Sequence, residues 1–188
     1  MKKGIFIDGK YVDAKNQYTV YSPFSEIKLS EVALSNAEEM RTAIRSAQRG
    51  FHKIRKLPAH ERANILLRAA HMYQERKEEV AQTICQEAAK PIVAARMEVE
   101  RTIQTLKFSG EEAKRIGGET IPLDAAIGGE GRYAFTVRQP LGVIGAIAPF
   151  NFPLNLVVHK VGPALAAGNS IIVKPAEQTP LSSFLLAE

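Results

Sequence analysis

The chain has 188 residues, of which 45% are hydrophobic and 24% charged, a composition that indicates a globular protein and excludes a disordered or fibrous one. Its net charge is +5, but 25 basic residues alternate with 20 acidic residues without any block of like charge, which argues against a nucleic-acid-binding arm. The single cysteine, Cys85, excludes a disulfide framework. Neither a signal peptide nor a run of 18 apolar residues is found, so we expect a cytoplasmic protein without a membrane span.

The first part of the chain predicts a small β element. Asp8-Gly9 lies between the short runs 5–7 and 10–12, and this dipeptide is the strongest short signal for a two-residue hairpin turn of type I′. Two further strand-like runs follow at 18–21 and 28–34.

Four amphipathic helices are predicted after this element, because apolar residues recur at intervals of three and four. Ser35 and Glu38 have the spacing of a capping box, and Pro58 suits the start of the second helix. The fourth helix is expected over 91–116, where Gly117-Gly118 would form a left-handed cap. The apolar positions at helical spacing are Met40, Ile44, Ala47 and Phe51, then Ile65, Leu66, Ala69 and Met72, then Ala81, Ile84, Cys85 and Ala88, and finally Ile92, Ala95, Val99, Ile103, Leu106 and Ala113.

Residues 119–138 change the period again and predict a β-hairpin. Two strand-like segments, 119–124 and 132–138, flank the glycine-rich sequence IGGEG. Glycines between two strand patterns are typical of a turn, so this segment is expected to form one separate ribbon.

The last part of the chain predicts one βαβ unit. The segments 142–148 and 170–174 are continuously apolar, which is typical of strands buried on both faces of a parallel sheet. A helix with a proline at its first position is expected between them at 153–167, and another begins after Thr179-Pro180. The chain thus divides into residues 1–118 with the β element and helices, the hairpin at 119–139, and the α/β part at 140–188.

Asn151 lies in the corner IAPFNFPL, directly after the predicted strand 142–148 and before the next helix. Ligands of open α/β sheets bind at the carboxyl ends of the strands. A side-chain amide beside a helix N-terminus is neutral and directional, so it suits a donor to a carbonyl oxygen that becomes negative in a transition state. The alternative, that Asn151 only caps the helix, stays open at this point.

Lys174 and Glu177 follow the second predicted strand in the loop VKPAEQTP. The lysine can donate hydrogen bonds, and the carboxylate can accept them from two adjacent hydroxyls, as on a ribose. A surface salt bridge between the two residues is an equally open interpretation. The dinucleotide fingerprint G-x-G-x-x-G is absent, so spacing alone does not establish a nucleotide site.

The segment PLGVIGAIAPFNFPLNLVVHKVGPALAAGNSIIVKPAEQTPLS closely resembles the start of the cofactor domain in NAD(P)-dependent aldehyde dehydrogenases. Upstream, QEAAKPIVAARMEVER resembles a diverged helical stretch of that family, with Ala88-Ala89 where the family usually has Thr-Gly. The resemblance extends over essentially all 188 residues, which correspond only to the front part of a longer enzyme.

The resemblance implies an α/β fold of the aldehyde dehydrogenase type: an incomplete Rossmann-type parallel sheet with an N-terminal β element, helices and an oligomerisation hairpin. It implies that Asn151 helps to stabilise the oxyanion of a thiohemiacetal, and that Lys174 and Glu177 contact the adenosine ribose. It also implies a homo-oligomer formed through the hairpin at 119–138. The residues that would line the nicotinamide end are Ile147, Ala148, Pro149 and Phe150.

NAD is the cofactor that the resemblance favours, with NADP as the alternative, because the Glu177 carboxylate would repel a 2′-phosphate at close range. The corner looks most like that of family members acting on small hydroxy- or phospho-aldehydes, such as lactaldehyde or glyceraldehyde 3-phosphate. Phe150 stands where other branches of the family carry a tryptophan.

The catalytic cysteine and the general-base glutamate of the family lie beyond residue 188. Cys85 does not replace this nucleophile, since it lies on the apolar stripe of a helix and buried apolar cysteines are inert. We therefore expect the N-terminal part of an enzyme that oxidises an aldehyde to a carboxylic acid, inactive as 188 residues alone. The alternative is a non-catalytic truncated family member that acts as a nucleotide-binding or assembly module.

Overall fold

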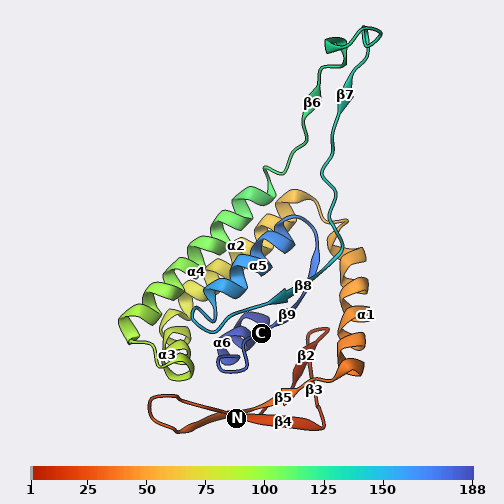
Figure 1. Ribbon diagram of the computed structural model, residues 1–188. Coiled ribbons are helices and arrows are strands. Elements are labelled where there is room, and N and C mark those ends of the chain that lie inside the picture. Colours follow the sequence, from red (N-terminus) through yellow and green to blue (C-terminus); the bar gives the residue numbers. More distant parts are fainter. Residues whose placement is uncertain (1) are drawn as a thin grey trace.

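The computed structural model describes residues 2–188, in which a layer of helices stands between a small β element and a long hairpin arm (Figure 1). The helices are α1 (Ala37–Ile54), α2 (Ala59–Glu75), α3 (Lys77–Ala88), α4 (Ile92–Ala113), α5 (Asn155–Ala166) and α6 (Leu181–Ala187). The strands are β1 (Lys2–Lys3), β2 (Ile5–Ile7), β3 (Lys10–Val12), β4 (Asn16–Tyr21), β5 (Lys28–Leu34), β6 (Thr120–Ile121), β7 (Ala134–Phe135), β8 (Val143–Ile147) and β9 (Ser170–Lys174).

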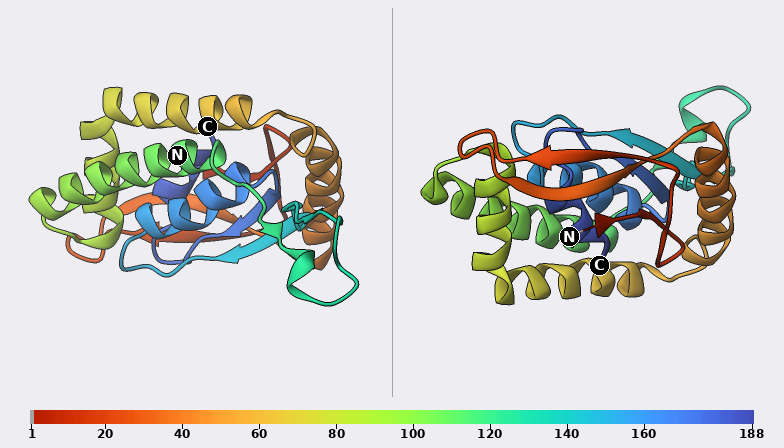
Figure 2. Two further views of the ribbon diagram at one scale, coloured as in Figure 1. Left: turned by 90° about the horizontal axis from the view of Figure 1, so that it is seen from above. Right: turned by 90° about the horizontal axis from the view of Figure 1, so that it is seen from below.

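The hydrophobic core lies where α4 packs against α2, α3 and α5, and the views from above and below show α2, α4 and α5 side by side (Figure 2). Leu66, Ile103, Leu106 and Leu154 are each at most 1% exposed. Fully burying a side chain of this size contributes roughly 2 kcal/mol. Most of the apolar positions predicted for the third and fourth helices belong to this core or pack against it. In the second helix only Leu66 of the four predicted positions belongs to it, and Met72 is 51% exposed, so the stripe predicted there is partly wrong.

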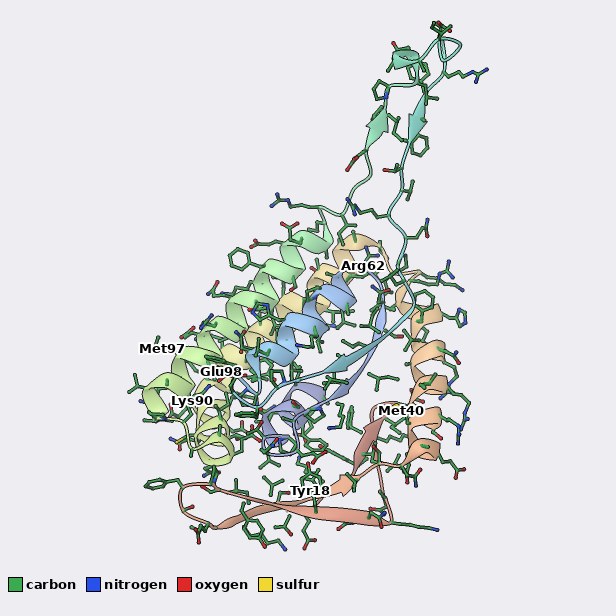
Figure 3. All side chains as sticks on the ribbon, viewed as in Figure 1. Tyr18, Met40, Arg62, Lys90, Met97 and Glu98 are labelled. Carbon is green, nitrogen blue, oxygen red and sulfur yellow. The ribbon has the colours of Figure 1, made fainter. Side chains whose placement is uncertain are left out.

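Helix α1 lies beside β8 and β9 and contributes no residue to the core. Its apolar stripe is only partly covered, and Met40, labelled in Figure 3, is 40% exposed.

The N-terminal cap of α1 differs from the prediction by one residue. The side chain of Asn36, not of Ser35, accepts hydrogen bonds from the amides of Glu38 and Glu39, because Asn36 is the last residue with extended backbone. The Asn36 amide in turn donates a hydrogen bond to the Glu39 carboxylate.

The predicted hairpin at Asp8-Gly9 is present, with β2 and β3 antiparallel on either side of it. Both turn residues have positive φ, 54° and 74°, as a type I′ turn requires. Beside it, β4 and β5 pair antiparallel and β1 joins β5 in parallel, so the predicted strands at 18–21 and 28–34 are confirmed, the first beginning two residues earlier.

The βαβ unit is also present, with α5 connecting the parallel strands β8 and β9. Their register pairs Val143 with Ser170 and Ile147 with Lys174. The expectation that both strands are buried on both faces is wrong, since Ile147 is 74% exposed while its neighbour Ala146 is buried. Within residues 2–188 this sheet has two strands, so fewer neighbouring side chains cover it than in a wider parallel sheet.

The hairpin arm projects away from the helices (Figure 1), and its strands β6 and β7 are only two residues long each. The predicted strands at 119–124 and 132–138 are therefore too long, because the 3₁₀ turn Leu123–Ala125 ends the ladder early. The glycine cap predicted for α4 is also wrong. The helix ends at Ala113. Gly118 instead lies so close to the opposite strand of the hairpin arm that a Cβ atom on it would be 1.6 Å from the carbonyl oxygen of Thr136.

Among residues 2–188, no helix combines the length and the apolar character that crossing a membrane demands.

Candidate functional site

The carboxyl ends of β8 and β9 meet at one edge of the parallel sheet. Ile147 is paired with Lys174, and the Ala148 amide donates a hydrogen bond of 3.0 Å to the Lys174 carbonyl oxygen. Asn151 lies four residues beyond Ile147, and Glu177 lies three residues beyond Lys174. The structure thus brings the two predicted groups of site residues to the same edge, which sequence spacing alone did not establish.

Asn151 is exposed and does not cap α5. The N-cap of this helix is Leu154, and the helix begins at Asn155, two residues after Pro153, which was predicted at its first position. Within residues 2–188, the side-chain amide of Asn151 has no hydrogen-bond partner, although its main-chain carbonyl oxygen accepts one from Lys90. The capping alternative is therefore wrong, and the amide remains available to a ligand.

The first amides of α5 are capped from a distant helix. The carboxylate of Glu98, a fully buried residue of α4, accepts hydrogen bonds of 3.1 Å from the amides of Leu154 and Asn155. Its second oxygen forms an ion pair with Lys90, and Figure 3 shows these two side chains close together. A carboxylate at a helix N-terminus interacts favourably with the helix dipole and satisfies amides that have no partner within the helix.

The residues predicted to line the nicotinamide end differ in exposure. Ala148 is buried, whereas Ile147, Pro149 and Phe150 are exposed at the edge of the sheet. Phe150 is 59% exposed, so its ring is accessible from outside the chain. This segment therefore presents an open apolar surface directly before Asn151.

Lys174 and Glu177 form an ion pair, with 3.4 Å between Nζ and Oε1, as one of the two interpretations expected. Both side chains are more than half exposed, so the contact is weak and open to competition from a ligand. Tyr18 of β4, labelled in Figure 3, lies near enough to Glu177 and Glu87 for their charges to affect its hydroxyl. Burial, reinforced by the negative charges of Glu177 and Glu87, raises the pKa of Tyr18 to about 12.

A second buried carboxylate, Glu87 of α3, caps the helix that follows this loop. It accepts hydrogen bonds from the amides of Leu181 and Ser182 at 2.6 and 3.1 Å, so the predicted cap at Thr179-Pro180 is wrong. Burial raises the pKa of Glu87 to about 7, against the hydrogen bonds from Ser182 and Leu181, which lower it. The loop of Lys174 and Glu177 is thereby anchored at its far end.

Sequence reasoning missed Lys90, Glu98 and Glu87, because charged side chains are usually solvated. One signal was available for Glu98, since it lies within the apolar stripe between Ala95 and Val99. Cys85, by contrast, packs against the core as expected.

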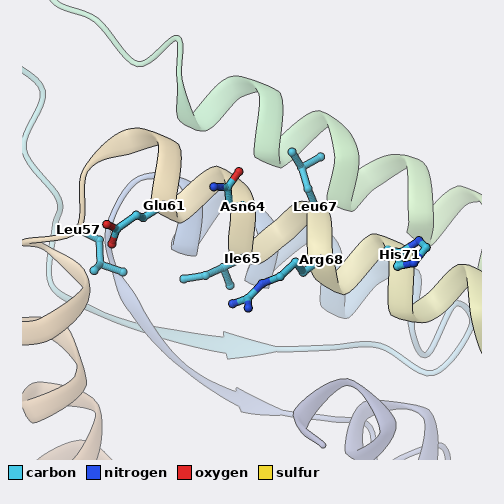
Figure 4. A pocket seen from close by; sticks show the side chains of 7 residues that line it. All are labelled: Leu57, Glu61, Asn64, Ile65, Leu67, Arg68 and His71. Carbon is cyan, nitrogen blue, oxygen red and sulfur yellow. The ribbon is translucent and has the colours of Figure 1, made fainter.

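A surface hollow lies away from this edge, on the outer face of α2 (Figure 4). None of the residues predicted for the site contributes to it. Its lining residues are Leu57, Glu61, Asn64, Ile65, Leu67, Arg68 and His71. The edge formed by β8 and β9 is therefore the candidate site.

Residues 11–188 match the family model described as "Aldehyde dehydrogenase family". The chain belongs to the aldehyde dehydrogenase family. This confirms the resemblance seen in the residues 140–182, and it accounts for the α/β architecture observed.

Curated relatives in this family include a 3-sulfolactaldehyde dehydrogenase from Priestia aryabhattai, 41% identical over 98% of this chain and 38% of the relative. A lactaldehyde dehydrogenase from Methanocaldococcus jannaschii is 40% identical with the same two coverages. Among solved structures, NADP-dependent glyceraldehyde-3-phosphate dehydrogenase from Bacillus halodurans C-125, complexed with NADP, superposes with a TM-score of 0.94 at 35% identity, over 99% of this chain and 40% of that structure. The chain thus spans about two fifths of the length of these family members.

Proposed function

We propose that this chain is the N-terminal part of an NAD(P)-dependent aldehyde dehydrogenase, which oxidises an aldehyde to a carboxylic acid through a thiohemiacetal and a thioester on a cysteine outside these residues. The observation that supports this most is the pairing of Ile147 with Lys174, which gathers the Asn151 corner and the Glu177 loop at one edge of a parallel sheet in a chain of this family. The division into residues 1–118, 119–139 and 140–188 is part of the proposal.

Asn151 supplies the oxyanion donor in this proposal. Its side-chain amide donates a hydrogen bond to the aldehyde oxygen as that oxygen becomes negative, and an interaction of this kind lowers the barrier because it strengthens in the transition state. The amide is exposed and makes no hydrogen bond within residues 2–188, so binding the oxygen breaks no existing contact. Because an amide is neutral, its donor capacity does not change with pH.

A dinucleotide fits the donor set at this edge, where Lys174 can donate to its ribose hydroxyls and Glu177 can accept from them. When bound, NAD(P) supplies the hydride acceptor. Separating the two side chains costs little, since an exposed ion pair contributes at most about 1 kcal/mol. The nicotinamide end would lie against the surface formed by Ile147, Ala148, Pro149 and Phe150.

The proposed substrates are small hydroxy- or phospho-aldehydes, with lactaldehyde and glyceraldehyde 3-phosphate the first to test. Support comes from the names of the relatives, which act on lactaldehyde, sulfolactaldehyde and glyceraldehyde 3-phosphate.

The proposed partner is a second copy of the chain, bound through the hairpin arm. The apolar residues Ile127, Tyr133 and Phe135 of this arm are largely exposed. With one free cysteine and no disulfide in the described part, the cytoplasm is the proposed compartment.

The proposal is tested by expressing the protein from its native gene and following NADH formation with each aldehyde. We expect activity from the whole gene product and none from residues 1–188 alone, because the nucleophile lies outside them. NADH formation by residues 1–188 that survives Cys85→Ala would contradict this account of the nucleophile. A gene product that binds NAD without oxidising any aldehyde would favour the alternative, a non-catalytic nucleotide-binding module.

Cofactor preference gives a separate prediction. Glu177→Ser is expected to raise the ratio of kcat/KM with NADP to kcat/KM with NAD by about tenfold or more, because it removes a negative charge facing the 2′-phosphate. The matched control is Glu112→Ser, which removes the same charge from another exposed ion pair, Glu112–Arg115, away from the site and the hairpin strands. An unchanged ratio in Glu177→Ser would exclude this residue as the determinant of cofactor choice.

A further inference from the structure

A buried ion pair lies behind the Asn151 corner. Lys90, in the link between α3 and α4, contacts the carboxylate of Glu98, and the side chains are 15% and 0% exposed. Burying such charges costs several kcal/mol per ion, a cost that is offset only when every charged atom has good partners. The partners that complete this pair all come from the segment 151–155.

Glu98 fixes the segment that follows Asn151. Its Oε1 atom accepts hydrogen bonds from the amides of Leu154 and Asn155, each at 3.1 Å. Hydrogen bonds to a charged group are stronger than those between neutral groups. The start of α5 is therefore held to α4 at the point where the corner becomes helical.

Lys90 fixes the corner at Asn151 itself. Its Nζ atom donates a hydrogen bond of 2.9 Å to the main-chain carbonyl oxygen of Asn151 and lies 4.1 Å from the ring centroid of Phe152. Arg101 of α4 is positioned against the same ring, 5.7 Å from its centroid. The backbone on the carboxyl side of Asn151 is thus tied to α4 through one cation.

We propose that Lys90 and Glu98 are positioning residues that aim the side-chain amide of Asn151. This inference rests on the proposed function, since the direction of the amide affects the reaction rate only if the amide donates a hydrogen bond to an oxyanion. The amide has no hydrogen-bond partner of its own within residues 2–188, so its direction is set by the backbone from which it projects. A displacement of about 1 Å in such a donor is enough to cost about 100-fold in rate.

The test uses the protein expressed from its native gene. Lys90→Met keeps the length of the side chain and removes the ammonium, and we expect kcat for aldehyde oxidation to fall about 10- to 100-fold while KM changes less than about threefold. Lys90→Arg, which keeps the charge beside Glu98, is expected to recover most of the loss. The matched control is Lys77→Met, which removes an ion pair between α3 and α4, Lys77–Glu100, that does not contact the corner.

A double-mutant cycle separates positioning from general destabilisation. If Lys90 acts through Asn151, Lys90→Met lowers kcat no further when Asn151 is already alanine. An equal loss in both backgrounds would overturn the proposal. Should Lys90→Met fail to fold because Glu98 is left unpaired, the double variant Lys90→Met/Glu98→Gln removes both charges together and keeps an oxygen acceptor for the α5 amides.

Crystal structures of the wild type and of the folded Lys90 variant provide a readout that needs no activity. We expect one orientation of the Asn151 side chain in the wild type and a shifted or multiple orientation in the variant. An unchanged corner would overturn the positioning role. A gene product that oxidises no aldehyde would contradict the proposed function, and the structural comparison would still decide whether Lys90 holds Asn151.

Discussion

Replacing Asn151 with alanine is expected to lower kcat for aldehyde oxidation by about 10²- to 10³-fold, the cost of removing one oxyanion donor in other acyl-transfer sites. The side chain is exposed and has no hydrogen-bond partner within residues 2–188, so its loss should leave the free energy of unfolding nearly unchanged. The measurement is steady-state kinetics of the gene product together with a thermal melt. Large losses in both would assign Asn151 a structural role instead.

Two further variants sharpen this test. Asn151→Asp keeps the size of the side chain but replaces the donor with a negative charge, so we expect at least as large a loss as with alanine. Asn64→Ala removes an exposed amide on the outer face of α2, far along the chain from the corner, and should leave kcat unchanged. An Asn151→Asp variant with near-wild-type kcat would exclude the oxyanion role.

Stability should depend on pH through Glu87. Its pKa rises from an ordinary 4.5 to about 7 because it is buried, so the folded state keeps a proton that the unfolded state loses near pH 4.5. Stability therefore falls as pH rises from about 4.5 to about 7, by on the order of 3 kcal/mol from this group. The negative charge of Glu98 also raises the pKa of Glu87. The charge of Glu87 in turn raises the pKa of the Tyr18 hydroxyl.

Glu87→Gln is the variant that checks this. It is neutral at every pH, so we expect the fall in Tm between pH 5 and pH 8 to become clearly smaller than in the wild type. Glu79→Gln on the same helix is the control. The pKa of Glu79 is lowered by Arg76, so this side chain contributes to stability at neutral pH and cannot produce the falling slope. A slope that persists in Glu87→Gln would assign the pH dependence to other groups.

The elements with local signals could be predicted from the sequence. Asp8-Gly9 is readable because only a few residue types tolerate positive φ at both turn positions. The βαβ unit is readable because 142–148 and 171–173 are short runs without a polar side chain on either side of a helical pattern. In both cases the physical cause lies within a few neighbouring residues, which is why the prediction succeeded.

Elements whose partners are distant in sequence could not be predicted in the same way. Glu98 caps an amide 56 residues further on, and Glu87 caps one 95 residues further on, so nothing near either residue in the sequence identifies its partner. The Asn151 corner was found because its own residues are distinctive. The groups that hold it, Lys90 and Glu98, became visible only once α4 and α5 were placed side by side.

The register of the parallel pair restricts where the chain can change length. Ile147 faces Lys174 at the last paired position, so both site loops start from one common reference point. One additional residue inside β8 would advance Asn151 by about 3.3 Å relative to Glu177 and turn every following side chain to the opposite face. Additional residues near Gly128 and Gly131, at the tip of the arm, would leave that reference point untouched. Homologous chains should therefore tolerate insertions at the arm tip and exclude them from the paired strands.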